Sequence, residues 1–311
     1  MKKIFVLFTA LLLCSTLSQG QNDTLWKTGG VFNVMFSQVS LSNWAAGGEN
    51  SVALNGLANL FAYHKKGNTT WDTNLDLGFG LTQQGEESAR KNDDRIELNS
   101  KFGYNAYHSK LFYTALFNFR SQFAPGYNYP RTDSSNYISK FAAPAFTLLA
   151  LGMDYKPTDY FTLFISPFSA RYVIVNDDSL SATGAFGVEP GQKVRSEVGA
   201  YLNTRILKEV VKNVTVMSKL DLFSNYKENP ENIDVNWEIL ISMKINKFIS
   251  ASIGAQVIYD DNTAIPLFEE KNGVRTPVLD MNQVQKTGPR TQIRQIFAIG
   301  LNYKLQNFRI R

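Results

Sequence analysis

A strict two-residue alternation in residues 233–245 constrains the fold of this chain more than any other feature. Every odd position of this stretch carries a large apolar residue, and Asp234, Glu238 and Lys244 are among the residues between them. Successive side chains of a β-strand point to opposite faces of a sheet, so this stretch is predicted to be a strand with one apolar face and one polar face. The fold then depends on which of the two faces points inward.

The same alternation recurs along most of the chain and predicts twelve strands. These predicted strands lie near 29–39, 51–64, 70–83, 95–107, 111–123, 145–156, 160–175, 194–206, 213–226, 233–245, 248–260 and 290–305. Short connections alternate with mostly long ones between them. An even number of up-and-down strands places both chain ends on the short-turn edge, as in bacterial outer-membrane barrels, which have short periplasmic turns and longer external loops.

The number of strands favours an apolar exterior. About eight strands already leave a ligand cavity inside a barrel, so twelve would enclose a lumen too wide to be filled by an apolar core. With the opposite polarity, the apolar residues meet lipid and the charged residues line a wet lumen, while closure of the sheet satisfies the backbone. A Lys or Arg facing lipid at mid-bilayer would cost about 2–4 kcal/mol. We therefore predict an all-β fold, a twelve-stranded antiparallel up-and-down transmembrane β-barrel of the outer-membrane type.

The N-terminal residues indicate export from the cytoplasm. Two lysines, a short apolar run and small residues before Gln21 predict a secretory signal peptide over residues 1–20. The only cysteine, Cys14, lies inside it behind Leu13, where a lipoprotein signal would have a small residue, so no lipidation is expected. The predicted organisation is completed by a periplasmic N-terminal tail over 21–28, the barrel over 29–305 and a C-terminal tail over 306–311.

These features predict a location and several partners. The barrel is expected in the outer membrane of a Gram-negative bacterium, in contact with outer-membrane lipid and with both termini periplasmic. The formal net charge of +5 is scattered along the chain, so no nucleic-acid partner is expected. Gly300, Tyr303 and Leu305 of the last strand resemble the glycine, aromatic and hydrophobic spacing that the barrel-assembly machinery recognises, although Ala298 stands where a polar residue is preferred.

One segment also resembles a known family. Residues 36–56, FSQVSLSNWAAGGENSVALNG, are similar to the N-terminal signature of a Bacteroidota outer-membrane family that is catalogued only as a domain of unknown function. The WKTGG opening and the later ISPFSAR stretch are similar too, which extends the resemblance over most of the mature chain. The resemblance implies a Gram-negative outer-membrane location. It implies no activity, because the family is itself uncharacterised.

Two groups of charged residues share the inward phase of the predicted strands. Reflecting strands across their turns puts Asp76 opposite Asn99 and Asn99 opposite Arg120. The first group, on three consecutive strands, is Asp76, Glu97, Lys101 and Arg120. The second group, around the 227–231 loop, is Lys219, Asp221 and Glu238. Buried charges are expected to be paired, so these residues predict either a structural ion network that fills the barrel or a charged eyelet that selects solutes.

The long connection over residues 125–142 has a composition that could contact sugars. Its aromatic and charged residues, which could stack on a saccharide or sit at a membrane rim, include Tyr127, Tyr129, Arg131 and Tyr137. No catalytic constellation accompanies them. His64 and His108 each lie beside a short turn, where interfacial roles are expected. Asp260 and Asp261 lack the regular ligand spacing of a dedicated Ca²⁺ site. We predict no enzyme activity, metal or cofactor.

Two functions from different classes follow from this sequence. The first is a narrow channel or specific pore for a small polar solute, because polar and charged residues occupy the inward phase of the strands. The second is a plugged barrel that serves as a scaffold or as a subunit of a cell-envelope complex, with another envelope protein as its partner. The two differ in whether the lumen is open.

Overall fold

The computed structural model of this chain describes residues 26–41, 49–106, 110–127, 137–263, 265–271, 274–281 and 283–306. The predicted signal peptide, residues 1–20, lies outside these residues, as do residues 307–311 of the predicted C-terminal tail. Among the described residues, no helix is both long and apolar enough to cross a membrane.

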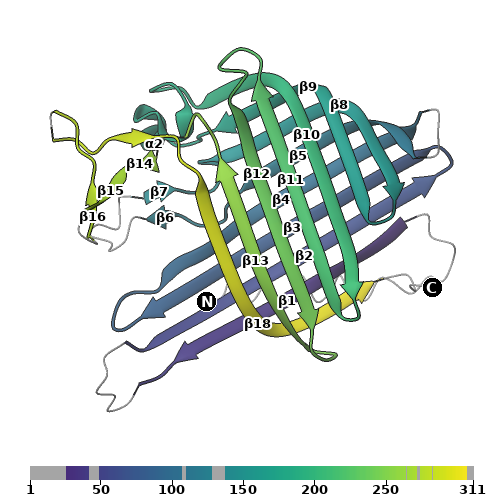
Figure 1. The fold of residues 1–311 in the computed structure, drawn as a ribbon, viewed down its shortest axis with the longest axis horizontal. Coiled ribbons are helices and arrows are strands. Elements are labelled where there is room, and N and C mark those ends of the chain that lie inside the picture. Colours follow the sequence, from purple (N-terminus) through teal and green to yellow (C-terminus); the bar gives the residue numbers. More distant parts are fainter. Residues whose placement is uncertain are drawn as a thin grey trace.

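Twelve antiparallel strands close into one barrel (Figure 1), as the alternation predicts. The barrel strands are β1 (Trp26–Val39), β2 (Ser51–Lys66), β3 (Thr69–Gln84), β4 (Arg90–Asn105), β5 (Leu111–Ser121), β8 (Ala145–Thr158), β9 (Phe161–Ile174), β10 (Val194–Val211), β11 (Val214–Asn225), β12 (Ile233–Lys244), β13 (Ile249–Tyr259) and β18 (Gln292–Gln306). Each strand pairs with its neighbour in sequence among these twelve, and β1 pairs with β18 to close the ring. The first strand begins at Trp26, so part of the segment 21–28 that was expected to be a tail belongs to the barrel.

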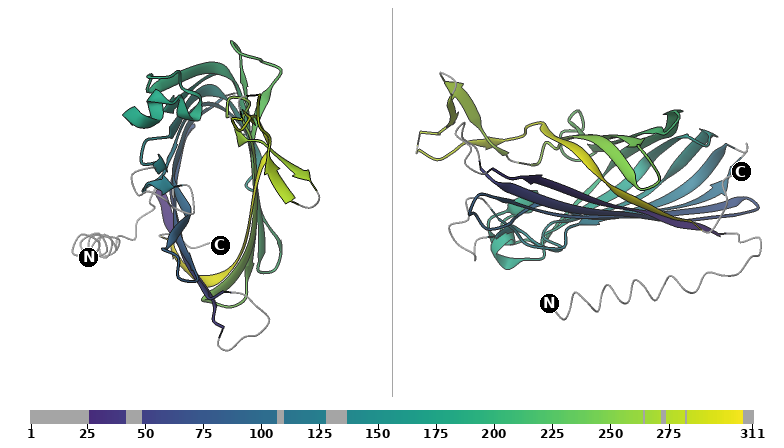
Figure 2. Two further views of the ribbon diagram at one scale, coloured as in Figure 1. Left: turned by 90° about the vertical axis from the view of Figure 1, so that its left-hand side faces the viewer. Right: turned by 90° about the horizontal axis from the view of Figure 1, so that it is seen from below.

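The smaller elements gather at the edge that carries the long connections (Figure 1). They are β6 (Gly126–Tyr127), β7 (Tyr137–Ser139), α2 (Asp178–Ala182), the 3-10 turn η2 (Ala185–Gly187), β14 (Ile265–Pro266), β15 (Phe268–Lys271), β16 (Val274–Pro277) and β17 (Thr287–Gly288). The β15–β16 hairpin belongs to the long connection over 262–289. It lies outside the ring of barrel strands (Figure 2, left).

Tight turns fix the register at the opposite edge. Gly67 adopts a φ of +54° between β2 and β3, and Asn213 adopts a φ of +67° between β10 and β11. These left-handed conformations suit glycine and asparagine and allow the chain to reverse within two residues. A slip of one residue would turn every apolar side chain to the other face, so these turns also preserve the polarity of the wall.

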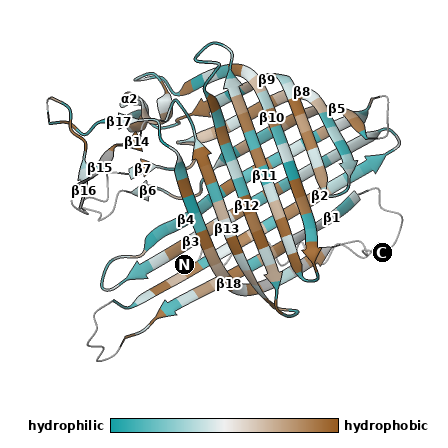
Figure 3. Ribbon diagram, viewed as in Figure 1, coloured by the Kyte–Doolittle hydropathy of each residue, from teal (hydrophilic) through white to brown (hydrophobic). Residues whose placement is uncertain are grey.

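The outer wall of the barrel is apolar and its inner wall is polar. Outward side chains such as Leu54, Leu151 and Phe297 are 54%, 64% and 69% exposed. Figure 3 shows hydrophobic and hydrophilic residues alternating along the barrel strands. Exposed aromatic residues occur toward the strand ends, including Trp71 and Tyr303. An apolar exterior with interfacial aromatics around a polar interior is the arrangement of a transmembrane β-barrel.

The closure between β1 and β18 is the shortest pairing in the ring. It comprises seven residue pairs, from Gly29 opposite Gln306 to Met35 opposite Gly300. Every other pair of neighbouring barrel strands has ten or more. Beyond Gly300, β18 and β1 diverge toward the long-loop edge (Figures 1 and 2). We call this divergence the seam.

Candidate functional site

The charged residues of β3, β4 and β5 stand side by side on the inner wall. Asp76 lies opposite Glu97, and Glu97 lies opposite Arg120. The sequence had placed Asp76 opposite Asn99, so the predicted register was wrong by two residues. A two-residue shift keeps every side chain on its own face, because the strand period is two. The inward assignment is therefore unaffected by that error.

The two predicted groups meet across the lumen. The Lys219 ammonium lies 2.7 Å from Glu97 Oε1 and 3.6 Å from Asp221 Oδ2. Lys219 also stands opposite Glu238 in the β11–β12 ladder. The Arg95 guanidinium reaches Glu238 Oε1 at 3.4 Å. We call Arg95, Glu97, Lys219, Asp221 and Glu238 the central cluster.

The central cluster joins opposite walls of the barrel. Arg95 is on β4 and Glu238 is on β12, and five strands separate β4 from β12 in either direction around the ring. Side chains that meet across such a ring require a flattened cross-section, which is visible as an oval outline in Figure 2 (left). The cluster divides the lumen into one half lined by β5, β8, β9, β10 and β11 and another lined by β13, β18, β1, β2 and β3.

A second set of ion pairs lies between the central cluster and the short-turn edge. Asp154, which is 0% exposed, lies 3.9 Å from the Lys101 ammonium and 3.4 Å from the Lys156 ammonium. Lys156 also contacts Asp72 at 2.9 Å, and Lys101 donates a hydrogen bond to Asn203 Oδ1 at 3.0 Å. Lys101 therefore belongs to this set, while Asp76 accepts a hydrogen bond from Asn59 Nδ2.

The sequence prediction missed several of these charged residues. Arg95, Asp154 and Lys156 were not among the candidates, although each shares the inward phase of its strand. Arg120 was a candidate, but among the described residues no carboxylate lies within ion-pair distance of it, and its guanidinium packs over the Phe146 ring at 4.9 Å. The alternation along each strand identified which side chains line the inner wall. Which of these charged side chains form ion pairs with each other depends on the flattened cross-section.

The half lined by β5, β8, β9, β10 and β11 contains a packed core; we call it the packed half. Its inward apolar side chains form one buried cluster: Leu116, Leu148, Ala150, Phe164, Tyr201 and Phe223. The Arg171 guanidinium packs over the Phe223 ring at 4.2 Å and reaches Asp234 Oδ2 at 2.6 Å. This half is filled by its own side chains.

The half lined by β13, β18, β1, β2 and β3 differs sharply; we call it the open half. Apart from Gly78 and Gly80, no inward residue of these strands is buried among those whose side chains the structure describes. Asn59, in the middle of β2, faces inward and is still exposed. Ile296, which stands opposite the inward Gly254, is 41% exposed. Solvent therefore reaches the inner wall of this half.

The predicted loop residues are only partly described. Tyr127 and Tyr137 pair in the β6–β7 ladder, while Tyr129 and Arg131 lie outside the described residues. The Tyr137 hydroxyl donates to Asp177 Oδ2 at 2.6 Å, and the Lys140 ammonium pairs with the same carboxylate. Asp177 also accepts from the Leu180 N–H at the start of α2. The bond from Lys140, followed by that from Tyr137, lowers the pKa of the Asp177 carboxyl.

The remaining candidates lie on the outer wall or outside the described residues. His64 packs against Trp26 with ring centroids 4.7 Å apart, as expected of an interfacial residue, and His108 is not described. Tyr303 and Leu305 face outward and are 61% and 43% exposed. Among the described residues, no group of three or more His, Cys, Asp or Glu could hold a metal ion.

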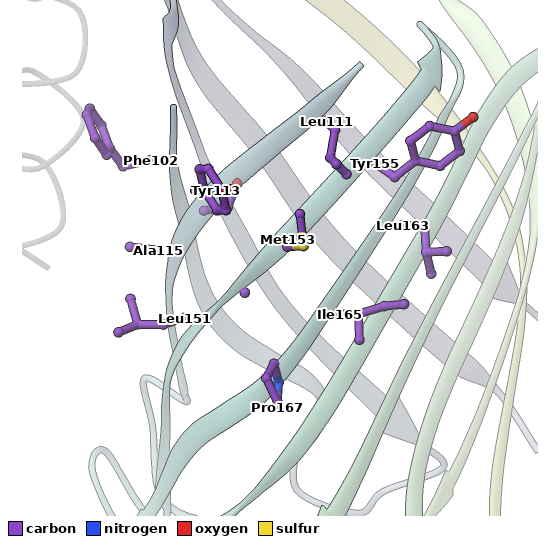
Figure 4. Close-up of a pocket in the computed structure, with 12 residues that line it drawn as sticks. Phe102, Leu111, Tyr113, Ala115, Leu151, Met153, Tyr155, Leu163, Ile165 and Pro167 are labelled. Atoms are coloured by element: carbon purple, nitrogen blue, oxygen red, sulfur yellow. The ribbon is translucent and has the colours of Figure 1, made fainter. Parts of the chain in front are cut away.

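A depression of about 720 Å³ lies on the outer wall at β4, β5, β8 and β9 (Figure 4). Its walls are apolar and include Tyr113, Leu151, Met153, Tyr155, Leu163 and Ile165. These side chains belong to the outward phase of their strands, so the depression faces away from the lumen.

Several solved barrels are similar to this chain. An outer-membrane channel from Pseudomonas putida F1 is 11% identical with a TM-score of 0.38, over 93% of this chain and 100% of that chain. Outer membrane phospholipase A from Escherichia coli is 11% identical with a TM-score of 0.39, over 93% and 96%. The translocator domain of autotransporter NalP from Neisseria meningitidis is 10% identical with a TM-score of 0.35, over 96% and 94%.

The sequence comparisons give one match. No curated protein matches the chain. Residues 36–127 match the model of a family described as a protein of unknown function (DUF3078). The predicted resemblance to an uncharacterised family is thereby confirmed, over β2, β3, β4 and β5 with the segments that flank them.

Proposed function

We propose that this barrel lies in the outer membrane of a Gram-negative bacterium, with both termini periplasmic, and conducts small polar solutes through the open half of its lumen. The observation that carries the proposal is the contrast between the two halves: inward side chains are buried in the packed half and accessible in the open half. The central cluster forms the boundary between them. The path is therefore off-centre and narrower than the ring of strands.

The lining of the open half indicates the class of solute. Its inward residues include a group that are small and polar or lack a side chain: Asn33, Asn59, Ser250, Ser252 and Gly254. Amides and hydroxyls both donate and accept hydrogen bonds, so they can replace water around an uncharged polar solute. Both bases of the central cluster, Arg95 and Lys219, are paired with its carboxylates, so this boundary carries only a small negative excess, three acids against two bases.

Conductance in planar bilayers tests the proposal. Wild-type protein is expected to give discrete conductance steps, and Gly254→Trp is expected to reduce them severalfold because the indole would enter the path. Ala255→Trp is the matched control, since it is the next residue on the same strand and faces outward. Equal reductions of the conductance in the two variants, or a wild-type protein that gives no conductance steps, would contradict the proposed conduit.

The second candidate is a closed barrel with a scaffold role in a cell-envelope complex. The ion pairs that join β4 to β11 and β12 favour it, because they tie opposite walls together. Replacing both partners, as in Glu97→Gln with Lys219→Met, distinguishes the two functions. A closed barrel would conduct only after this double replacement, and its partner would copurify in fixed proportion from detergent-solubilised membranes.

A further inference from the structure

The seam between β1 and β18 exposes strand edges inside the membrane-facing band. Residues 292–299 of β18 pair with β13 on one side, and on the other side no described strand pairs with them. Residues 36–39 of β1 likewise pair with β2 alone. An unpaired backbone N–H or C=O in hydrocarbon costs several kcal/mol, so such an edge needs polar or aqueous surroundings at membrane depth.

The seam lies within the hydrophobic band of the outer wall. It is on the long-loop side of the aromatic residues that mark the short-turn boundary of this band. Tyr303, on the short-turn side of the last pair, is an exposed interfacial residue, and the outward Phe297 and Ile293 continue the apolar face beyond Gly300. About nine to eleven residues of a strand span the bilayer, which places residues 293–299 at hydrocarbon depth. The seam therefore opens in the half of the bilayer that is nearer the long loops.

Gly300 stands at the point where pairing ends. A Cβ on Gly300 would lie 2.6 Å from the Val34 carbonyl oxygen and 2.7 Å from Met35 Cγ, so the last pair requires a glycine for this close approach. The same residue was singled out in the sequence as part of an assembly signal. Its position also gives it a role in defining where the two strands part.

The inner lip of the seam is apolar near Gly300, whereas Arg294, farther along β18, faces inward and pairs with Asp93 of β4 at 3.0 Å. Met35 and Ile296, on the two diverging strands, face inward, and Ile296 is 41% exposed. Deeper in the open half, the inward Asn33 and Asn59 place amide groups on the wall, and Asn59 Nδ2 donates to Asp76 Oδ1. An apolar lip at a membrane-level opening, followed by a polar wall, matches a molecule with a hydrocarbon tail and a polar head.

We propose that the seam is a lateral portal through which the open half takes up or releases amphiphiles with one acyl chain. The polar head lies against the amide-lined wall, while the tail passes over Met35 and Ile296 into the bilayer. The diverging edges also favour a flexible chain over a partner strand, because one strand could pair with only one of them. This portal extends the proposed conduit to a class of solute that reaches the lumen from the membrane.

Photo-crosslinking tests the portal. Benzoylphenylalanine replaces Ile296 or Met35 at the lip, Ala150 in the packed half, or Phe297 on the outer wall, in the full-length barrel in liposomes. The probe is tritiated palmitoyl-lysophosphatidylcholine, and heat-modifiable migration on gels selects folded protein. We expect the inward Ile296 and Met35 positions to approach the yield of the outward Phe297 position and to exceed Ala150 at least fivefold. Yields at both lip positions equal to that at Ala150 would overturn the portal.

A reversible disulfide across the seam provides a second test of the portal. Cysteines introduced by Ser37→Cys and Ala298→Cys continue the β1–β18 register by one inward pair, and the only native cysteine lies in the predicted signal peptide. We expect their disulfide to lower the crosslink at Met35 severalfold, with recovery on reduction. Val34→Cys with Leu301→Cys staples an existing pair and should change nothing. An unchanged yield in the stapled seam would contradict the portal, while conductance of small polar solutes reports separately on the conduit.

Discussion

The packed half and the open half are built from the same alternating strands, yet they differ in what their inward positions hold. In the packed half these positions include Leu116, Phe164 and Tyr201, which form a buried cluster, together with buried polar residues such as Asp154 and Asn203. In the open half they carry small residues such as Asn33, Ser252 and Gly254 beside larger ones, and apart from Gly78 and Gly80 none is buried among those whose side chains the structure describes. Strand parity therefore fixes the face, while the packing of the inward side chains against each other decides whether a lumen is filled.

The largest difference between the halves is expected in stability. Phe164→Ala removes a fully buried ring from the packed half and should lower the free energy of unfolding by about 3–5 kcal/mol. Ile296→Ala in the open half, where the side chain is already partly solvated, should cost well under half as much. Urea titration in liposomes, followed by tryptophan fluorescence, measures both. Equal losses would show that the halves are packed alike.

A buried ion pair should show a similar contrast with a smaller effect. Asp154→Ala leaves the Lys101 and Lys156 ammonium groups without their shared carboxylate and should cost about 3 kcal/mol. Asn59→Ala removes a solvated amide from the open half and should change stability by about 0.5 kcal/mol or less. Urea titration in liposomes measures the change in the free energy of unfolding for both variants. If Asp154→Leu combined with Lys101→Met recovers most of the loss, the cost arises from unpaired charge.

The loops above the barrel provide a pH-dependent prediction. Lys140 and Tyr137 lower the pKa of Asp177, so the ionised carboxylate stabilises the folded loop at pH values above about 4, the ordinary pKa of an Asp side chain. This stabilisation is lost as the pH falls below that value. Asp177→Asn should abolish the pH dependence. Hydrogen exchange of the α2 segment between pH 3 and pH 7 measures this. A wild-type loop with equal protection at both limits would contradict the assignment.

The smallest expected effect concerns the ends of the strands. Lys208 packs over the Tyr160 ring at 4.6 Å, and both residues are exposed. Lys208→Ala should therefore change stability by about 0.5 kcal/mol or less, in line with the usual worth of an exposed cation–π pair. Thermal unfolding in detergent would detect a larger role. A loss comparable to that of Phe164→Ala would contradict the view that the core lies inside the packed half.

The sequence predicted the strands and their faces because both follow from a local period of two. Asp76, Glu97 and Arg120 were placed on the correct face, although their register was displaced by two residues at the turns. The contact between Lys219 and Glu97 was not predictable, since it depends on how far the ring is flattened. The seam was equally hidden, because the length of the β1–β18 pairing is set by closure of the whole barrel.

Thiol accessibility tests the asymmetry of the lumen most directly. Single cysteines introduced by Asn59→Cys and Ser252→Cys in the open half, and by Thr114→Cys and Ala150→Cys in the packed half, would react with a water-soluble methanethiosulfonate in barrels held in liposomes. We predict that the two open-half positions react at least tenfold faster than the two packed-half positions. Equal rates at all four positions would contradict the account.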